Sequence, residues 1–471
     1  MTSVLIRTLV VWIMAIVPVF MGLPTKVILS IWGFIAVISI LIPPGNRTIR
    51  SLFLYAACIS FTSVDYLSST PDGFVGGAPP ALAFYPVDLL LIPVILFGVL
   101  EGKLMRPKGI FGLLLILGGF WTLVAFSSVL GGSMDVAAMQ QALVMPRGML
   151  AGYIVWSFCI SRRDRKIIGM ALTAGLGFQV VIGALQHFRG DVMGLHLLGE
   201  APADQLSKYI AYGIKLWRSG GTLGHPNVFA SYLIATIPIG AALVAACRGA
   251  GRRLILSVIV AGGLFVLIWT YSRGAWLVAG IVTLYAIIVG IRTLFRGYAL
   301  AGAAIVLTTV LIVGFPTIRH RIEQTERSAT DVRIELLSIA TDMVTAYPAT
   351  GVGLGAAPSR LPSFDPNLRL ELFRHPVHNI IMLDFAEMGV PGGLISILLF
   401  GGSLVWAAVK IRRGMITTAW LEAGFSVGVA ALVLHNLVDW TLRVPHIILL
   451  FWILVASADI WGRTEYSSTE I

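Results

Sequence analysis

An arginine at the junction of two hydrophobic segments is the first residue whose type and place suggest chemistry. Arg273 lies in a Tyr-Ser-Arg-Gly sequence that begins at Tyr271, and almost no loop separates the apolar segments on either side. A charge at the centre of a membrane helix costs about 2.5–3.5 kcal/mol, so this guanidinium either snorkels to the lipid headgroups or is kept to bind an anion. Gly274 favours anion binding because it lets a ligand approach the backbone, and the planar guanidinium matches a lipid phosphate.

A histidine and a second arginine lie in a polar segment further along the chain. His378 opens a predicted helix, and a histidine that acts as a base near neutral pH contributes about 10²–10⁴-fold to a rate. The alternative is a histidine that caps the helix or contacts a headgroup. Arg333 lies on an amphipathic helix predicted over residues 329–343, where it either binds the same anion or pairs with Glu335 at the surface.

Two histidines, His375 and His378, have a spacing that some metal sites use. No cysteine or carboxylate stands near them at the spacing of a further ligand. We therefore expect no metal and no cofactor.

A glycine-rich sequence at residues 220–227 leads directly into another hydrophobic segment and contains His225, Pro226 and Asn227. A proline just inside a helix start, after a glycine-rich turn, leaves backbone N–H groups free at the helix mouth. These groups form either an anion cradle or a plain connection between loop and helix. Arg218, just before this sequence, is a further basic candidate.

The composition defines the class of protein that must position these residues. The chain has 471 residues, of which 57% are hydrophobic and 12% charged, and its mean hydropathy is +0.89. A soluble domain carries about a quarter charged residues, and here apolar blocks long enough to cross a bilayer recur from end to end. The sequence predicts an all-α polytopic membrane protein with about 12–14 transmembrane helices. It excludes cytosolic enzymes, secreted disulfide scaffolds and nucleic-acid binders. The predicted spans are 4–21, 27–43, 51–66, 83–100, 109–130, 139–160, 167–186, 227–246, 254–271, 275–291, 298–316, 391–409, 419–438 and 445–462.

The chain has a net charge of +11, and its basic residues are distributed unevenly among the loops. Lys and Arg are concentrated in the short loops at every second crossing, and the positive-inside rule assigns these loops and both termini to the cytoplasm. Two long segments, 187–226 and 317–390, then face outward. They retain many arginines, although outward loops are normally poor in Lys and Arg, which indicates an anionic ligand. The chain thus divides into N-terminal helices (1–186), these two loops, central helices (227–316), and C-terminal helices with a short tail (391–471).

Two pairs of charged residues fall within or beside predicted spans. Arg147 and Asp88 both lie toward the outer ends of their spans and form either a mutual ion pair or part of a ligand site. Asp439 and Arg443 are four residues apart, which predicts an ion pair at the last outward turn. His435 lies on the same helix face as Asp439.

In their order and spacing, these motifs resemble the O-antigen ligases and polymerases of bacterial envelopes. The resemblance covers roughly residues 220–395. It rests on Gly-Thr-Leu-Gly-His-Pro-Asn at 221–227, Ser-Arg-Gly at 272–274, Arg333 with Pro-x-x-Gly-Val-Gly-x-Gly at 348–355, and His378-Asn379 with Glu387-x-Gly389. It implies a GT-C-like fold with outward catalytic loops. It also implies that Arg273 and Arg333 bind a diphosphate and that His378 is the essential histidine. We further predict that His225, Asn227, Asn379, Glu387 and Asp88 support the site.

The resemblance implies a metal-independent inverting glycosyltransferase at the outer face of the bacterial cytoplasmic (inner) membrane. Such an enzyme moves a glycan en bloc from undecaprenyl diphosphate to an acceptor hydroxyl. Metal-dependent transferases typically use an Asp-x-Asp pair, which occurs nowhere in this chain, so arginines would neutralise the leaving diphosphate. Arg273 and Arg333 are predicted to clamp it, with Arg147 or Arg218 as lesser contributors. His378 would take the proton of the acceptor hydroxyl.

The acceptor separates the members of this family. It is the lipid A core for ligases, a growing glycan for polymerases and a protein hydroxyl for protein O-oligosaccharyltransferases, and the sequence does not distinguish them. Membrane lipids and a chain-length regulator or flippase are further candidate partners. A different class, the lipid-linked oligosaccharide flippases, would also suit the basic residues. Such transporters tend to have related halves, and no internal repeat is visible here.

Overall fold

The computed structural model describes six long ranges of the chain: 106–131, 136–159, 161–209, 215–294, 327–365 and 375–459. It also describes residues 56, 65–66, 83–84, 95–96 and 100. The four predicted N-terminal spans, apart from those few residues, and the span 298–316 lie outside the described residues. The predicted number of spans therefore stays a prediction.

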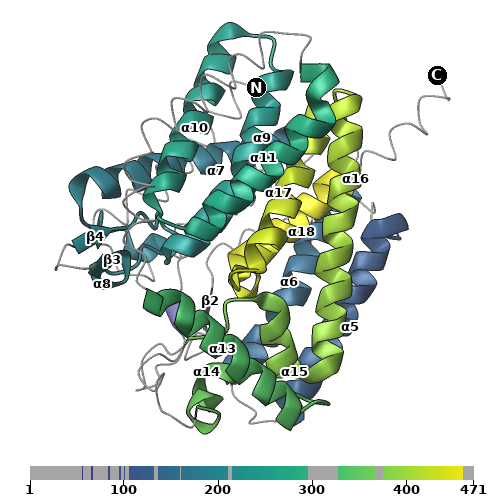
Figure 1. The fold of residues 1–471 in the computed structure, drawn as a ribbon. Coiled ribbons are helices and arrows are strands. Elements are labelled where there is room, and N and C mark those ends of the chain that lie inside the picture. Colours follow the sequence, from purple (N-terminus) through teal and green to yellow (C-terminus); the bar gives the residue numbers. More distant parts are fainter. Residues whose placement is uncertain are drawn as a thin grey trace.

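The described chain is built of long helices that lie side by side, with shorter ones across one end (Figure 1). The long helices are α5 (Gly109–Gly131), α6 (Val136–Phe158), α7 (Arg162–Arg189), α9 (Pro226–Ala246), α10 (Ala250–Trp269), α11 (Arg273–Leu294), α13 (Arg327–Ala346), α15 (Ile380–Ser396), α16 (Gly402–Ile416), α17 (Trp420–Asn436) and α18 (Pro445–Asp459). The short elements are η2 (His196–Leu198), α8 (Ala203–Leu206), α14 (Ala357–Arg360), η4 (Leu361–Ser363), the π-helical turn η5 (Ile397–Gly401) and η6 (Thr441–Arg443). Two pairs of very short antiparallel strands accompany them, β1 (Asp65–Tyr66) with β2 (Ala83–Phe84) and β3 (Ser207–Tyr209) with β4 (Lys215–Trp217).

Five of the described helical segments are long and apolar enough to cross a membrane. They are Gly109–Gly131, Arg162–Arg189, Pro226–Ala246, Ala250–Trp269 and Ile380–Ile416. The predicted all-α polytopic membrane fold is thereby confirmed.

The backbone breaks from helix at Gly389, whose φ of 69° and ψ of −169° are not helical, so two helices meet there in a kink. The second helix begins close to residue 391, where the sequence placed the start of a span, and it reaches Ile416 by way of η5 and α16. Helix resumes at once because Pro391 lies in the first turn after the kink, where a proline is tolerated.

The core lies where α9, α17 and α18 pack together. α18 is buried along its length, and its residues from His446 to Ala458 have almost no exposed surface. Small residues let α17 approach α9 closely: a β-carbon at Gly428 would lie 2.6 Å from the backbone oxygen of Ala235. Close helix contact at small residues is the usual way in which membrane helices gain packing energy.

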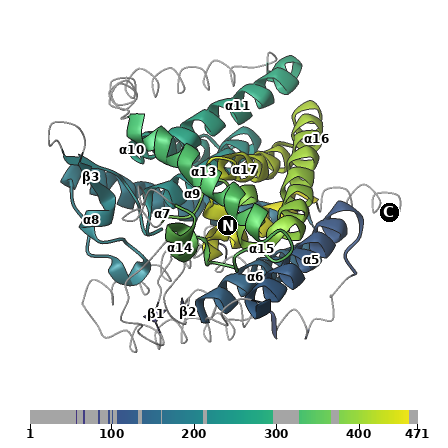
Figure 2. The same ribbon diagram turned by 60° about the horizontal axis from the view of Figure 1, so that its bottom comes forward.

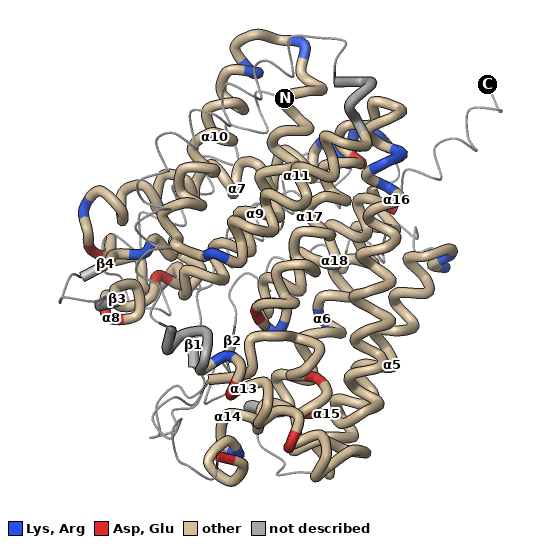
Figure 3. The backbone as a smooth tube through the Cα atoms, viewed as in Figure 1, with Lys and Arg blue, Asp and Glu red and all other residues tan. Residues whose placement is uncertain are grey.

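The described helices have two chemically different ends (Figure 3). At what we call the basic end, Lys410 at the end of α16 pairs with Glu422 at the start of α17 (Nζ–Oε1, 3.1 Å). The buried Arg165, near the start of α7, also interacts electrostatically with Glu422. At the opposite end, which we call the loop end, lie α13 and α14 (Figure 2). The basic residues of α7, α10 and α16 thus occur at alternate helix junctions, as the sequence predicted.

α13 at the loop end confirms the amphipathic helix predicted over 329–343. Its apolar side packs against the first turns of α15 and the segment before them. The buried residues of this small core include Leu336, Ile339, Ala340 and Met343 of α13, with Val377, Leu383 and Ala386. Arg333 lies on the exposed side of the same helix.

Candidate active site

The turn between α10 and α11 presents Arg273, the first residue of α11. The turn is tight because Tyr271 adopts a left-handed backbone conformation, with φ 53°, which is uncommon for a residue other than glycine. It is also held from the side: the backbone N–H of Ser219 donates to the oxygen of Trp269 at 3.0 Å. Arg218 donates from Nε to the oxygen of Thr270 at 2.8 Å.

Arg218 continues into a chain of hydrogen bonds that joins three elements. A terminal nitrogen of Arg218 donates to Oδ1 of Asn227 at 2.8 Å, and Nδ2 of Asn227 donates to Oδ2 of Asp439 at 2.8 Å. The backbone N–H of Trp440 donates to the other carboxylate oxygen of Asp439 at 2.8 Å. This chain ties the α10–α11 turn and the start of α9 to the end of α17. Arg218, predicted to bind the diphosphate, here supports the turn that carries Arg273.

The glycine-rich sequence 220–227 is a connection between loop and helix. The N–H groups of Gly220 and Gly221 donate to Oε1 of Gln186 (3.1 and 2.8 Å), and that of Thr222 donates to Oε1 of Gln179 (3.1 Å). Buried glutamines of α7 thus occupy these three donors, which favours the plain connection between loop and helix over an anion cradle.

His225 caps α9. Its Nδ1 accepts a hydrogen bond from the backbone N–H of Asn227 at 3.1 Å, and the residue is exposed. This gives His225 a structural role at the start of α9, and its predicted supporting role in the site stays a prediction.

The start of α15 places His378 beside this hydrogen-bonded chain. Asn379 caps α15 by accepting from the N–H groups of Ile381 and Met382, both at 3.0 Å. Its Nδ2 donates to the oxygen of Leu437, just beyond α17, at 3.0 Å. Asn379 thus ties the chain next to His378 to Leu437, which lies two residues before Asp439.

His378 has the electrostatic surroundings of a histidine that is neutral at physiological pH. Burial lowers its pKa, the carboxylate of Asp439 raises it, and Arg333 and His375 lower it. A hydrogen bond with the carbonyl of Pro376 also raises it. A neutral imidazole near a guanidinium can take a proton, which is what a general base requires.

His435 links these residues to the α10–α11 turn. Its side chain is buried and its Nδ1 lies 2.8 Å from Oγ of Ser231 on α9. A β-carbon at Gly274 would lie 3.6 Å from both Cδ2 and Nε2 of His435. Arg333 and Asp439 both act electrostatically on this imidazole. Arg333 and His378 thus interact electrostatically with residues at the end of α17, and the backbone directly after Arg273 lies against His435.

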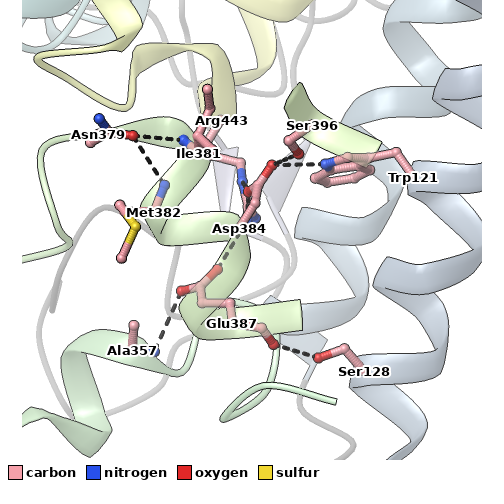
Figure 4. A network of polar contacts seen from close by, with 10 residues as sticks. All are labelled: Trp121, Ser128, Ala357, Asn379, Ile381, Met382, Asp384, Glu387, Ser396 and Arg443. Atoms are coloured by element: carbon pink, nitrogen blue, oxygen red, sulfur yellow. Dashed lines mark hydrogen bonds and ion pairs between the residues drawn. The ribbon is translucent and has the colours of Figure 1, made fainter. Parts of the chain in front are cut away.

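A buried polar network holds α15 from its other side (Figure 4). Arg443 donates to Asp384, with one bond of 3.0 Å from Nε, and pairs with Glu387 at 3.1 Å. Nε1 of Trp121 on α5 donates to Asp384 at 2.9 Å, and Ser396 donates to the same carboxylate. All of these side chains are buried.

This network corrects one prediction and gives Glu387 a structural role. The predicted ion pair between Asp439 and Arg443 is wrong, because Arg443 turns to the carboxylates of α15 and Asp439 accepts from Asn227. Glu387 also accepts from the backbone N–H of Ala357 at 3.4 Å. It therefore supports the site by fixing α15 and the residues before α14.

The glycine-rich turn at residues 348–355 lies against the kink of α15. The N–H of Val352 donates to the oxygen of Ala386 (2.9 Å), and that of Val390 donates to the oxygen of Pro348 (2.7 Å). The backbones approach so closely that a β-carbon at Gly351 would lie 2.2 Å from the carbonyl carbon of Glu387. Glycine is required here by space and by its φ of 69°.

Two predicted site residues lie apart from these contacts or outside the described residues. Arg147 lies on α6, where that helix packs on α18, and interacts electrostatically with His446. Asp88 is outside the described residues, so its predicted pairing with Arg147 is untested. Within the described ranges, no group of three or more His, Cys, Asp and Glu side chains is arranged to hold a metal ion.

Comparison with known proteins identifies the family that the central part of the chain resembles. The O-antigen ligase family model matches residues 257–397. This match confirms the resemblance found in the motifs, and it supports a glycosyltransferase of the O-antigen ligase or polymerase type in general. The matched range contains Arg273, Arg333 and His378. No curated protein matches the chain.

The sequence did not reveal the partners of several residues of this site, because those partners are distant along the chain. The Ser231–His435 bond joins residues 204 positions apart, and the Arg443–Asp384 bond joins residues 59 apart. The only sequence signal was a polar residue at an otherwise apolar position of a span. That signal marks such residues as buried and bonded without naming the partner.

Proposed function

We propose that this O-antigen ligase-like protein is a metal-independent inverting glycosyltransferase at the outer face of the bacterial cytoplasmic membrane. Its donor is a glycan on undecaprenyl diphosphate, and its acceptor is a sugar hydroxyl of the lipid A core or of a growing glycan. One observation carries this proposal: a half-buried His378 interacts electrostatically with Asp439 and Arg333, and hydrogen bonds through Asn227 and Arg218 join Asp439 to the turn that carries Arg273.

The proposed reaction assigns one role to each of these residues. Arg273 and Arg333 bind the diphosphate and stabilise the negative charge that develops as the bond between the anomeric carbon and the phosphate oxygen breaks. His378 takes the proton of the acceptor hydroxyl as its oxygen attacks that carbon from the opposite side, which inverts the configuration. Asp439 stabilises the resulting imidazolium, since it favours the protonated form of His378.

Transfer by purified protein tests this proposal. The protein in detergent, treated with EDTA, is given an undecaprenyl-diphosphate-linked oligosaccharide and a glycan acceptor. We expect glycosidic product with inverted configuration. A flippase would give no product, because it needs a membrane barrier to act on and forms no bond. Absence of product with every glycan and lipid A-core acceptor would contradict the proposed activity.

Variants of the histidine test the mechanism. We expect His378→Ala to lower turnover by about 10²–10⁴-fold while donor binding is largely kept, because the imidazole acts on the acceptor. His196→Ala is a matched control, since His196 also lies in a loop-end segment but is exposed and bonded to the backbone of Glu200. Full activity of His378→Ala would remove the base from the mechanism.

A further inference from the structure

His435 is a buried histidine that the proposed reaction does not use. It occupies the last turn of α17, with 1% of its surface exposed. One edge of its ring faces Ser231 of α9, and the other faces Gly274 of α11. His435 thus joins α17 to α9 and α11, and its contacts depend on which ring nitrogen carries the proton.

The neighbouring hydroxyl groups answer that question. Ser231 donates its single hydroxyl proton to the backbone oxygen of Asn227 at 3.1 Å. A hydroxyl has only one proton, so in the arrangement in which Ser231 donates to Asn227, Nδ1 of His435, 2.8 Å away, is the donor to Ser231. Thr441 fits the same scheme: it accepts from Nδ2 of Asn436 at 3.1 Å and gives its own proton to Ser231 at 2.8 Å.

In that arrangement the second ring nitrogen of His435 presents a lone pair to the start of α11. A β-carbon at Gly274 would lie 3.6 Å from Nε2, so the ring edge lies against the backbone directly after Arg273. The N-terminus of a helix carries partial positive charge, and the guanidinium of Arg273 adds a full one. A neutral imidazole with its lone pair on this side suits both groups, whereas a protonated ring would repel them.

We infer that His435, held in one tautomer by Ser231, is a positioning residue for Arg273. It fixes the first turn of α11 against the end of α17 and so sets where the guanidinium stands. This inference rests on the proposed function, in which Arg273 binds the donor diphosphate. It predicts that changes at His435 and Ser231 affect the donor and leave the acceptor unaffected.

Conservative replacements separate the two edges of the ring. In His435→Asn the amide can replace the Nδ1 donor to Ser231 but leaves the space beside Gly274 empty. In His435→Gln the longer side chain can fill that space but loses the geometry at Ser231. A displacement of about 1 Å can cost 10²-fold, so we expect His435→Asn to raise the donor KM between about tenfold and a hundredfold. His435→Gln should retain a lower donor KM than His435→Asn, and both should keep the acceptor KM.

Ser231→Ala provides a second, independent variant with a matched control. It removes the acceptor for Nδ1 of His435, and the donor KM should rise. Ser426→Ala removes an equally buried hydroxyl from α17, one that bonds only within its own helix to the oxygen of Glu422 at 2.8 Å. That control should keep the donor KM. A purely structural role would lower the yield and thermal stability of Ser231→Ala without moving its donor KM.

A final experiment compares the effect of His435→Asn in the wild-type protein and in the Arg273→Lys variant. Because His435 acts through Arg273, His435→Asn should add no further increase in donor KM when Arg273 is already lysine. Equal increases in both backgrounds would overturn the inference. If Arg273→Lys itself leaves the donor KM unchanged, the proposed diphosphate site is wrong. If Arg273→Lys raises it while the His435 and Ser231 variants match the wild type, only the positioning role is wrong.

Discussion

At the scale of single residues, the protonation of His378 depends on charges of opposite sign. Burial lowers its pKa, Asp439 raises it, and Arg333 and His375 lower it. His225, at the start of α9, interacts with the same imidazole. The base form of His378 is therefore available over a pH range that each of these neighbours can move.

Replacing the two strongest charged neighbours should shift the pH profile in opposite directions. In Asp439→Asn the carboxylate no longer favours the imidazolium, so the pKa of His378 falls and the acidic limb of the rate profile moves to lower pH. In Arg333→Gln a repelling charge is lost, so that pKa rises and the limb moves to higher pH. The measurement is the pH dependence of turnover at saturating donor.

A third variant controls for general damage at this end of the molecule. Arg360→Gln removes an exposed arginine of α14 and should leave the acidic limb in place. Shifts of Asp439→Asn and Arg333→Gln in the same direction would contradict the assignment of that limb to His378.

The sequence supplied Arg273, Arg333 and His378 because each belongs to a short motif that can be read locally. It did not supply the contacts of His435, the use of Arg218 as a support or the burial of Asp439. Those properties depend on which helix ends meet. Arg443 shows this most clearly: the four-residue spacing to Asp439 favoured a local ion pair, yet two carboxylates on α15 offered better burial and geometry.

At the scale of elements, α15 is the part that must be held rigid. His378 lies directly before its N-cap residue, its middle carries Asp384 and Glu387, and its kink receives the glycine-rich turn 348–355. The sequence predicted a helix that opens at His378 and a span that begins at residue 391, just after the kink. It did not predict that the glycine-rich turn would pack against the kink, because contact between separate backbones leaves no periodic pattern.

The contact between the glycine-rich turn and the kink should be intolerant of a side chain. In Gly351→Ala the β-carbon would meet the backbone of Glu387 at 2.2 Å, and residue 351 would have to keep a φ of 69°. We expect a loss of at least about 1–3 kcal/mol in the free energy of unfolding, measured as thermal unfolding in detergent. Gly280→Ala is the control, since nothing lies within 4 Å of a β-carbon there. A Gly351→Ala protein as stable as that control would contradict the close approach.

The buried charges around Arg443 make a second prediction for this element. Arg443→Met leaves Asp384 and Glu387 buried without their cation, and breaking a buried pair typically costs about 3–5 kcal/mol. The corresponding loss of stability should be measurable by thermal unfolding. Arg412→Met removes an exposed arginine of α16, and such surface changes usually stay within about 0.5 kcal/mol. Equal stability of the two variants would show that the network contributes little.

At the scale of the whole molecule, the proposed site and the basic helix junctions lie at opposite ends of the bundle. Arg333 and His378 interact electrostatically at the loop end, whereas Glu422 interacts with Lys410 and Arg165 at the basic end. The sequence predicted this separation because charge placement in loops is a topological signal that does not depend on helix packing. Which end faces outward is an expectation from the same rule.

Cysteine labelling of intact cells tests that orientation. In a background with Cys58, Cys159 and Cys247 replaced by alanine, Ser359→Cys places a thiol on exposed α14 at the loop end. Thr417→Cys places one on the exposed turn after α16 at the basic end. A membrane-impermeant maleimide should label the first variant in spheroplasts and the second only after the membrane is permeabilised. The proposed donor carries its diphosphate and glycan on the outer leaflet, so only this orientation lets Arg273 and His378 reach it. The reverse labelling pattern would place the site on the cytoplasmic side and contradict the proposed reaction.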